Sequence, residues 1–310
     1  MSRELGAAPG WVNLSAAVVR RLPMGRYRAM NRLCRMKPSP AFLARMPADL
    51  GGSQFVCDLR DSISREVCFT GRYEAQETAL LNATLRPGMT FVDVGANWGY
   101  FTLIAAHLVG SEGRVLSLEP DPRLFTRLSE CVERNGLSQV SPLQIAAAAE
   151  AGTLNLSGYD ESSDNFGLSR IAGADNASGV EFAIAARPVD DVLAEAGVDS
   201  VDLLKMDIEG YEGFALAGME RALREHRIKR IILELHPGQM VEHGHNPNGV
   251  IAQLTVNGYQ AARIDHSPAA FRRAAYARTP QPADFLVPLA ANEPLDLWPH
   301  LFLTAPGVEF

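Results

Sequence analysis

The segment FVDVGANWGYF, residues Phe91–Phe101, decides the fold. Its first half continues a short apolar run, which predicts a buried parallel strand over 90–94. Gly95 and Gly99 then permit a sharp turn and a close approach of a ligand to the backbone. The apolar segment 100–109 that follows predicts a helix packed on a sheet, closed by Gly110. A strand, a glycine turn and a helix in this order are typical of an open α/β sheet.

The alternation of strands and helices continues on both sides of this unit. Further strands are predicted over 114–118, 140–147, 201–206, 230–235, 259–264 and 301–305, with helices at 74–85, 122–134, 212–226 and 247–257. Asp121 is expected to cap the helix that starts at Pro122. Repeated β-α units imply an α/β, Rossmann-like fold, with a mostly parallel sheet and helices on both faces.

The glycine turn predicts a site for a ligand with charges of both signs. The helix behind it presents free N–H groups and a positive dipole end, which suit a phosphate or a carboxylate. Asp93, at the end of the strand, could pair with an ammonium group. Glu119 ends the next strand, ahead of Pro120, where it could accept both hydroxyls of a ribose. S-adenosyl-L-methionine carries all three groups and is the predicted cofactor, with S-adenosyl-L-homocysteine as its product.

Two other functions stay open at this point. A NAD-type oxidoreductase could use a similar sheet, but Asn97 stands where the GxGxxG fingerprint requires its second glycine. A non-catalytic module could keep the fold and the cofactor for assembly. The charged residues of the segment DLLKMDIEGYE, residues 202–212, favour an active enzyme over both.

The predicted reaction centre lies at the ends of the two strands 201–206 and 230–235. Lys205, Asp207 and Glu209 alternate along the first, so we expect them on one face, in a network that neutralises their buried charges. His236 ends the second strand and could take a proton from an attacking hydroxyl. His236 and Asp207 are the candidates for the general base. His236 also begins a group with Glu242, His243 and His245, but their spacing fits no familiar metal site, and no metal ligand is predicted.

Charge divides the chain unevenly. The net charge is −7, which argues against a nucleic-acid binder, yet residues 3–45 hold nine Lys or Arg and one acid. We therefore predict a basic, helical N-terminal extension over 1–50. Its charged face is expected to be solvated, while an anionic partner or a homo-oligomer contact stays open. No segment has the roughly 18 apolar residues of a membrane span, and the four cysteines show no CxxC spacing, so a cytoplasmic location is expected.

The motifs resemble those of the FkbM family of S-adenosylmethionine-dependent methyltransferases. The resemblance runs over 74–236, and more loosely to 306, and its carriers are FVDVGANWGYFT, LEP, LLKMDIEGYE and ELHP in that order. It implies a class I methyltransferase fold, usually seven strands with the last one antiparallel. It also implies O-methylation of a hydroxyl on a small molecule such as a sugar, a polyketide or another secondary metabolite.

The resemblance also assigns residues to roles. Lys205, Asp207 and Glu209 would shape the site near the transferred methyl group. Together with the residue patterns, this predicts a methyltransferase domain over 51–310, with a hairpin-like segment at 54–73, a Rossmann-like core at 74–265, an insertion at 266–300 and a last strand at 301–306. A polar connection at 165–169 could form a lid over the substrate or be a solvated loop. The predicted cofactor contacts are Glu74, Asp93, Gly95, Ala96, Asn97, Gly99, Tyr100, Phe101, Glu119, Pro120, Ala147 and Asp207, of which Asp93, Gly95, Asn97, Gly99 and Glu119 follow from the resemblance.

Overall fold

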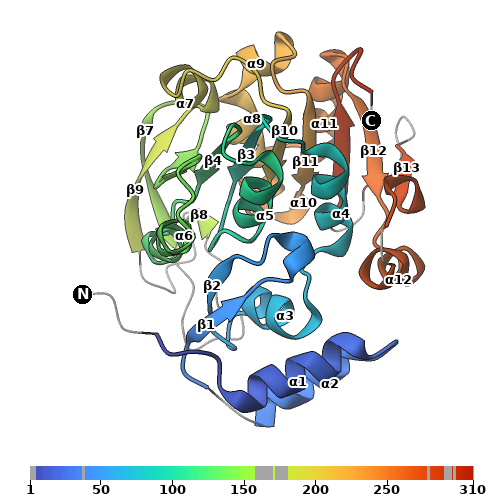
Figure 1. Ribbon diagram of the computed structural model, residues 1–310. Helices are drawn as coiled ribbons and strands as arrows, with labels where there is room; N and C mark the ends of the chain where they lie inside the picture. The colour runs from blue at the N-terminus through green and yellow to red at the C-terminus, as the bar shows by residue number, and fades with distance from the viewer. Residues whose placement is uncertain are drawn as a thin grey trace.

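The computed structural model describes residues 5–36, 39–157, 170–171, 181–277, 280–289, 295 and 298–309. The lid predicted at 165–169 lies outside these ranges, as does part of the 266–300 insertion. Within them the chain forms a central twisted sheet with helices against both faces, and an N-terminal layer below it (Figure 1). Among the described helices, none is long and apolar enough to cross a membrane.

The central sheet confirms the predicted α/β class. Five strands run parallel in the order β5-β4-β3-β10-β11, and β14 is inserted antiparallel between β11 and β12. A short strand, β13, extends the edge beyond β12, so the sheet has eight strands among the described residues rather than the seven expected. Their bounds are β3 (Thr90–Val94), β4 (Arg114–Leu118), β5 (Val140–Leu143), β10 (Leu203–Met206), β11 (Arg230–Glu234), β12 (Gln260–Ile264), β13 (Leu286–Pro288) and β14 (His300–Thr304).

Each face of the sheet has its own hydrophobic core, because successive strand residues point to opposite sides. Phe91 and Leu203 face one core, and Val92 and Leu204 face the other. The first core holds α4 (Ala75–Thr84), α5 (Tyr100–Val109), α6 (Pro122–Arg134) and α12 (Pro268–Tyr276). The second holds α7 (Val189–Glu195), α8 (Glu212–Ala217), α9 (Glu220–Arg224), α10 (Pro237–Glu242) and α11 (Pro247–Val256).

Local signals explain most helix bounds. The carboxylate of Asp121 accepts the Arg123 N–H at 2.8 Å and caps α6, as predicted. The predicted helix 212–226 is instead two short helices, α8 and α9. They separate at Gly218, where an added Cβ would lie only 1.9 Å from the Ala148 carbonyl oxygen. Tertiary contact therefore overrides a continuous helical pattern.

A second sheet follows β5 and was not predicted. The expected strand 140–147 divides into β5 and β6 (Ala146–Ala147), and β6 pairs with β9 (Glu181–Arg187). β9 also pairs with β7 (Gly152–Ser157), which pairs with β8 (Arg170–Ile171), giving the order β6-β9-β7-β8 among the described residues. This sheet lies along the side of the central sheet that ends in β4 and β5 (Figure 1).

The predicted hairpin at 54–73 was wrong in its second half. Strand β2 (Gln54–Cys57) pairs with β1 (Phe42–Arg45), and Glu66–Phe69 belongs to helix α3 (Ser62–Thr70). Asp61 and Ser62, which would form the turn of such a hairpin, lie at the start of this helix, because the Asp61 carboxylate accepts the Ile63 N–H at 3.0 Å. Val67, Cys68 and Phe69 are all buried, so the run lacks the polar face that reveals a helix.

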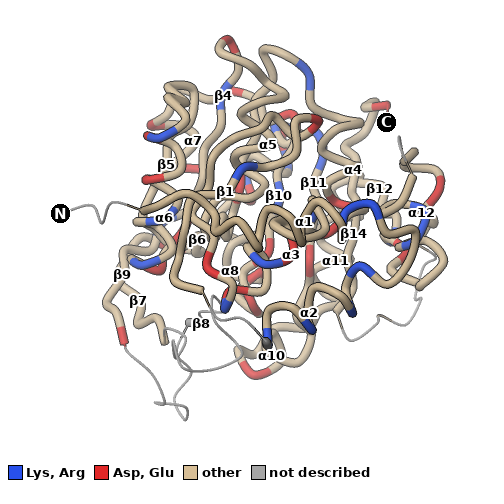
Figure 2. The backbone as a smooth tube through the Cα atoms, turned by 60° about the horizontal axis from the view of Figure 1, so that its bottom comes forward, with Lys and Arg blue, Asp and Glu red and all other residues tan. Residues whose placement is uncertain are grey.

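The basic N-terminal segment forms α1 (Gly10–Arg21) and α2 (Arg26–Met36), which lie against α3. Figure 2 shows its Lys and Arg positions along both helices. Arg20 is not simply solvated, because its guanidinium donates to the carbonyls of Val67 and Cys68 at 3.2 and 2.8 Å. The segment shares one hydrophobic cluster with the sheet. The domain boundary at residue 50 and the homo-oligomer contact stay predictions.

Candidate functional site

A cleft lies at the carboxyl ends of β3, β4 and β10, as expected for an open α/β sheet. The loop after β3 forms its floor, the end of β4 and the start of the second sheet form one wall, and the end of β10 forms the other. The structure brings most predicted site residues to this cleft. Those that line it are Gly95, Ala96, Asn97, Tyr100, Phe101, Glu119, Pro120, Ala147, Lys205, Asp207 and Glu209.

Four predicted residues do not line the cleft: Glu74, Asp93, Gly99 and His236. Asp93 is only 1% exposed, and its Oδ2 accepts the Thr102 hydroxyl at 2.7 Å. Its Oδ1 is buried without a hydrogen-bond partner among the described residues. Burial is the main cause that raises the pKa of Asp93 to about 6, against the opposing charge of Lys205. The side chain thus lies beneath the cleft rather than in its wall.

The two glycines of the loop serve its conformation more than ligand access. Gly95 has φ +84°, and an added Cβ would lie 2.0 Å from the Asp207 carbonyl oxygen. Gly99 has φ +100°, and its Cβ would lie 2.7 Å from a methyl group of Leu128. The neighbours that exclude a side chain are therefore the chain's own atoms. Gly95 nevertheless lines the cleft, and the approach of a ligand to this turn stays a prediction.

Glu119 joins the loops after β3 and β4. Its Oε2 accepts the Asn97 N–H at 2.8 Å, and its Oε1 accepts the Asp121 N–H at 2.9 Å. Burial raises the pKa of Glu119 to about 8, although the two N–H donors act in the opposite direction. The two N–H donors hold the carboxylate at the cleft wall. A ligand that donates further hydrogen bonds to it would stabilise its charged form, which burial disfavours.

Lys205 is the centre of an acidic network. It is 3% exposed, and its Nζ lies 3.3 Å from Oδ2 of Asp207, 3.9 Å from Oε2 of Glu74 and 4.6 Å from the ring centre of Phe101. Burial would lower its pKa, but the surrounding acids outweigh burial and raise it. Lys205 is therefore charged, and its ammonium offsets only part of the acidic charge around it.

The neighbouring acids show this excess directly. Burial raises the pKa of Glu234 to about 11, and the charges of Asp207 and Glu74 add to the effect. Burial also raises the pKa of Glu74, while Lys205 opposes it. Carboxylates that crowd one small volume cannot all ionise unless a cation joins them. The site is thus suited to a positively charged ligand.

His236 lies under the same acids. Its Nδ1 is 2.8 Å from Oε1 of Glu212, a fully buried carboxylate. Its Nε2 faces the acids of the cleft, at 3.9 Å from Oδ1 of Asp207, 3.7 Å from Oε2 of Glu209 and 3.6 Å from Oε1 of Glu234. Burial would lower the pKa of His236, but Glu212 and Asp207 outweigh burial and raise it. The ring can hold a proton close to Asp207.

The histidines that follow His236 pack against aromatic rings. His243 packs edge-on against Tyr211, with ring centres 5.7 Å apart, and His245 against Phe214, at 4.2 Å. These ring contacts pack the residues at the end of α10 against α8. The neighbouring cluster therefore has a structural explanation.

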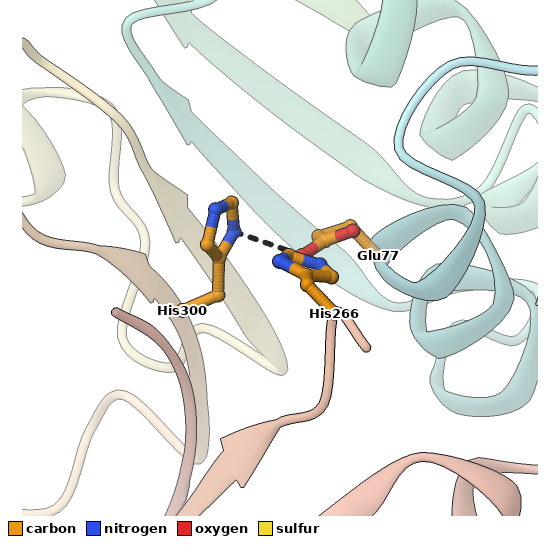
Figure 3. Close-up of side chains that lie close together, drawn as sticks. All are labelled: Glu77, His266 and His300. Atoms are coloured by element: carbon orange, nitrogen blue, oxygen red, sulfur yellow. Dashed lines mark ion pairs between the residues drawn. The ribbon is translucent and has the colours of Figure 1, made fainter. Parts of the chain in front are cut away.

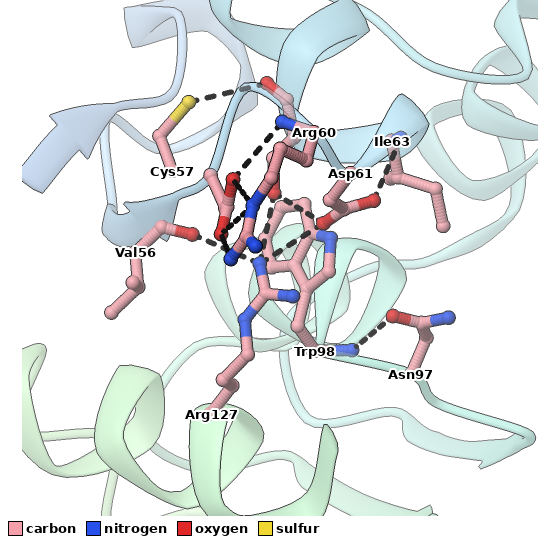
Figure 4. Close-up of polar contacts among 10 residues, drawn as sticks. Val56, Cys57, Arg60, Asp61, Ile63, Asn97, Trp98 and Arg127 are labelled. Carbon is pink, nitrogen blue, oxygen red and sulfur yellow. Dashed lines mark hydrogen bonds and ion pairs between the residues drawn. The ribbon is translucent and has the colours of Figure 1, made fainter. Parts of the chain in front are cut away.

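Sequence reasoning missed several residues of the site. Glu212 and Glu234 stand inside the quoted motifs EGYE and ELHP, and their acidity was the signal that could have found them. Ile63 lines the cleft from α3, where no periodicity points to it. Arg127 of α6 fixes the start of α3, because its guanidinium donates to the Asp61 carboxylate at 3.0 Å and to the Val56 carbonyl at 3.2 Å (Figure 4).

The N-terminal layer also supports the glycine loop. The rings of Phe55 in β2 and Trp98 in the loop are stacked, with centroids 5.0 Å apart and planes inclined by 15°. The Asn97 side chain accepts the Trp98 N–H at 2.8 Å (Figure 4). Asn97 itself has φ +53°, a left-handed conformation that asparagine tolerates. Residues before the first predicted strand therefore help to build the cleft.

The strand order, the antiparallel β14 and a cleft with an acid at the end of β4 define a class I S-adenosylmethionine-dependent methyltransferase. A family model of the methyltransferase FkbM domain matches residues 93–261. The chain belongs to the FkbM methyltransferase family.

The chain is also similar to several known proteins. The chain is 32% identical over 178 residues to the 31-O-demethyl-FK506 methyltransferase FkbM of Streptomyces tacrolimicus. This alignment covers 49% of this chain and 67% of that protein. It is 30% identical over 150 residues to the hexuronic acid methyltransferase AglP of Haloferax volcanii, covering 47% and 55% respectively. A solved FkbM methyltransferase from Methylobacillus flagellatus aligns over 90% of this chain and 71% of its own, at 18% identity and TM-score 0.41.

Proposed function

We propose that this enzyme transfers a methyl group from S-adenosylmethionine to a hydroxyl of a small molecule such as a sugar, a polyketide or another secondary metabolite. The observation that carries the proposal is the Asp207 carboxylate, which lines the cleft and is backed by the buried pair His236–Glu212. The names of the two relatives, a 31-O-demethyl-FK506 methyltransferase and a hexuronic acid methyltransferase, support an oxygen-bearing acceptor.

The residues present fit the cofactor. The excess of carboxylates around Lys205 suits the sulfonium and ammonium charges of the cofactor, and Glu119, which lines the cleft, would accept the hydroxyls of its ribose. The apolar wall at Ile145 and Ala147 suits a purine base. When bound, the cofactor supplies an electrophilic methyl group on a sulfur that leaves readily. The protein must then orient the acceptor and remove its proton.

We assign the base role to Asp207 rather than to His236. Burial would raise the pKa of Asp207, but Lys205 and His236 outweigh burial and lower it, so the carboxylate is ionised. It lines the cleft, whereas the His236 ring lies 3.9 Å behind it. Asp207 would accept a hydrogen bond from the acceptor hydroxyl and then take its proton. His236, oriented by Glu212, would stabilise the charge of the Asp207 carboxylate before this transfer. His236 is thus a positioning residue.

The two alternatives are less favoured. A NAD-type oxidoreductase does not fit membership of the FkbM family or the acid-rich end of β10. A non-catalytic module would not need the buried ionisable pairs Lys205–Asp207 and His236–Glu212, which are costly to bury.

The test is methyl transfer to matched acceptors. The enzyme is incubated with S-adenosylmethionine carrying a labelled methyl group and with sugars, uronic acids and macrolide alcohols. Each alcohol is paired with its deoxy analogue and its amino analogue. We expect labelled methyl ethers only from the alcohols, with loss of turnover in Asp207→Asn. Transfer to the amines alone would contradict O-methylation, and cofactor binding without any turnover would favour the non-catalytic module.

A further inference from the structure

A second polar cluster lies beside the cleft, where α4 meets the C-terminal strands. Its members are Glu77 of α4, His266, which follows β12, and His300, the first residue of β14 (Figure 3). Nε2 of His266 and Nδ1 of His300 each lie 2.9 Å from Oε1 of Glu77. The two imidazole rings are nearly perpendicular, with centroids 4.0 Å apart. Three segments far apart in the sequence thus direct ligand-type atoms into one small volume.

Glu77 is the unusual member of this cluster. It is fully buried, and neither of its carboxylate oxygens has a partner with hydrogen-bond geometry among the described residues. A buried carboxylate without such partners is costly, so it needs a compensating positive charge. The atoms nearest to its Oε1 are the two imidazole nitrogens, each at 2.9 Å, so the three groups converge on one point.

We propose that Glu77, His266 and His300 bind a divalent first-row transition-metal ion, with Zn²⁺ as the reference ion. Two ligand atoms about 2.1 Å from one ion lie roughly 3.0–3.4 Å apart at ordinary coordination angles. The three ligand atoms here all lie within 4.8 Å of one another, and two of the separations are 2.9 Å. Two imidazoles and one carboxylate favour zinc, cobalt, nickel or iron over magnesium and calcium.

The second nitrogen of His300 supports this assignment. Its Nε2 lies 3.4 Å from Oε1 of Glu234, which lines the cleft. Metal-ligating histidines typically donate their other ring N–H to a carboxylate, which fixes the ring and its tautomer. The ion would thus be joined to an acid of the reaction centre through one imidazole. The side chain of His266 is 35% exposed, which gives the ion a route from solvent and room for a water ligand.

The cluster also gives a role to the predicted insertion 266–300. His266 and His300 stand at the two ends of the insertion 266–300, and Glu77 belongs to the first helix of the core. An ion bound by all three would fasten the insertion to α4. Because these residues are distant in the unfolded chain, the ion would bind mainly the folded protein and stabilise it.

Direct binding to the full chain tests the site, independently of the acceptor. Untagged protein is stripped with a chelator and titrated with Zn²⁺, Co²⁺ and Mg²⁺ while its Tm and visible absorption are recorded. We expect Zn²⁺ and Co²⁺ to bind as one ion per chain and to raise the Tm, Co²⁺ to give a ligand-field band, and Mg²⁺ to do neither. No rise in Tm and no band with Co²⁺ would overturn the proposal.

Two variants locate the bound ion. Glu77→Gln and His266→Gln are expected to weaken Zn²⁺ binding about 100-fold or more and to remove the cobalt band. His107→Gln changes an exposed histidine of α5 and should behave as wild type. Affinity for S-adenosylhomocysteine, measured in each variant, shows that the cleft is still folded. Ion binding that persists unchanged in both variants would place the ion elsewhere and refute the site.

Discussion

Replacing Glu119 by Gln separates its two roles at the cleft. Each carboxylate oxygen accepts one backbone N–H, from Asn97 at 2.8 Å and from Asp121 at 2.9 Å. A glutamine can accept only one of them and turns its NH₂ group toward the other, which leaves one buried donor unpaired. That loss should cost about 1–3 kcal/mol of unfolding free energy. Two ribose hydroxyls that exchange a charged acceptor for a neutral one should lose about 2 kcal/mol together, or roughly 30-fold in Kd.

The pH dependence of the wild type follows from the same carboxylate. Its pKa is raised from 4.5 to about 8, mainly by burial, so the folded protein holds this proton more tightly than the unfolded chain. Its contribution to stability is therefore complete below pH 4.5 and is lost as the pH rises to about 8. A ligand that donates hydrogen bonds to the carboxylate needs the ionised form. Affinity for S-adenosylhomocysteine should therefore increase as the pH rises toward 8 and then level off.

Calorimetric titration with S-adenosylhomocysteine at a series of pH values measures both effects. Glu119→Gln should bind more weakly and lose the pH dependence, while urea unfolding reports its stability. Glu130→Gln is the matched control, because Glu130 lies on the outer side of α6, in an ion pair with Arg134. An affinity for Glu119→Gln equal to that of the control would refute a ribose contact at this residue.

Three further variants test the rest of the site. His236→Asn should slow single-turnover methyl transfer about 100-fold and leave cofactor affinity nearly unchanged, since the ring lies behind Asp207; a wild-type rate would remove its positioning role. Gly95→Ala should lower the unfolding free energy in urea by at least about 2 kcal/mol, because its Cβ would lie 2.0 Å from the Asp207 carbonyl oxygen; an unchanged midpoint would contradict the clash. Lys205→Met should lower the unfolding free energy by about 3–5 kcal/mol near neutral pH, because it leaves buried acids without a positively charged partner. The loss should shrink in mildly acidic buffer, since the pKa of Asp93 is already raised to about 6 and the acid takes up a proton; an equal loss at both pH values would show that charge neutralisation is not its role.

Part of the site could be read from the sequence because its chemistry is local. The glycine turn, the acid after β4 and the charges at the end of β10 each lie within a few residues of a strand end. Parallel strands bring their carboxyl ends to one edge, so Glu119 and Asp207 reach the same cleft. The helix cap at Asp121 was found for the same reason, since a cap depends only on neighbouring residues.

Depth within the site could not be predicted in this way. Strand alternation assigns a side chain to one face but does not say whether the cleft reaches it. Asp93 and His236 therefore belong to the predicted set and yet lie beneath the surface of the cleft. The reason why Gly95 is a glycine was also hidden, because the Asp207 carbonyl that excludes a side chain belongs to another strand.

The sequence by itself determined the main strands of the central sheet, the methyltransferase motifs and the family, because periodicity and turn chemistry are properties of short segments. Only the tertiary structure decided which distant segments complete the site. Helix α3 brings Ile63 to the cleft, and Glu77, His266 and His300 meet although the last two are separated by the whole insertion. Such contacts depend on how elements pack across the sheet, and no local pattern of residues encodes them.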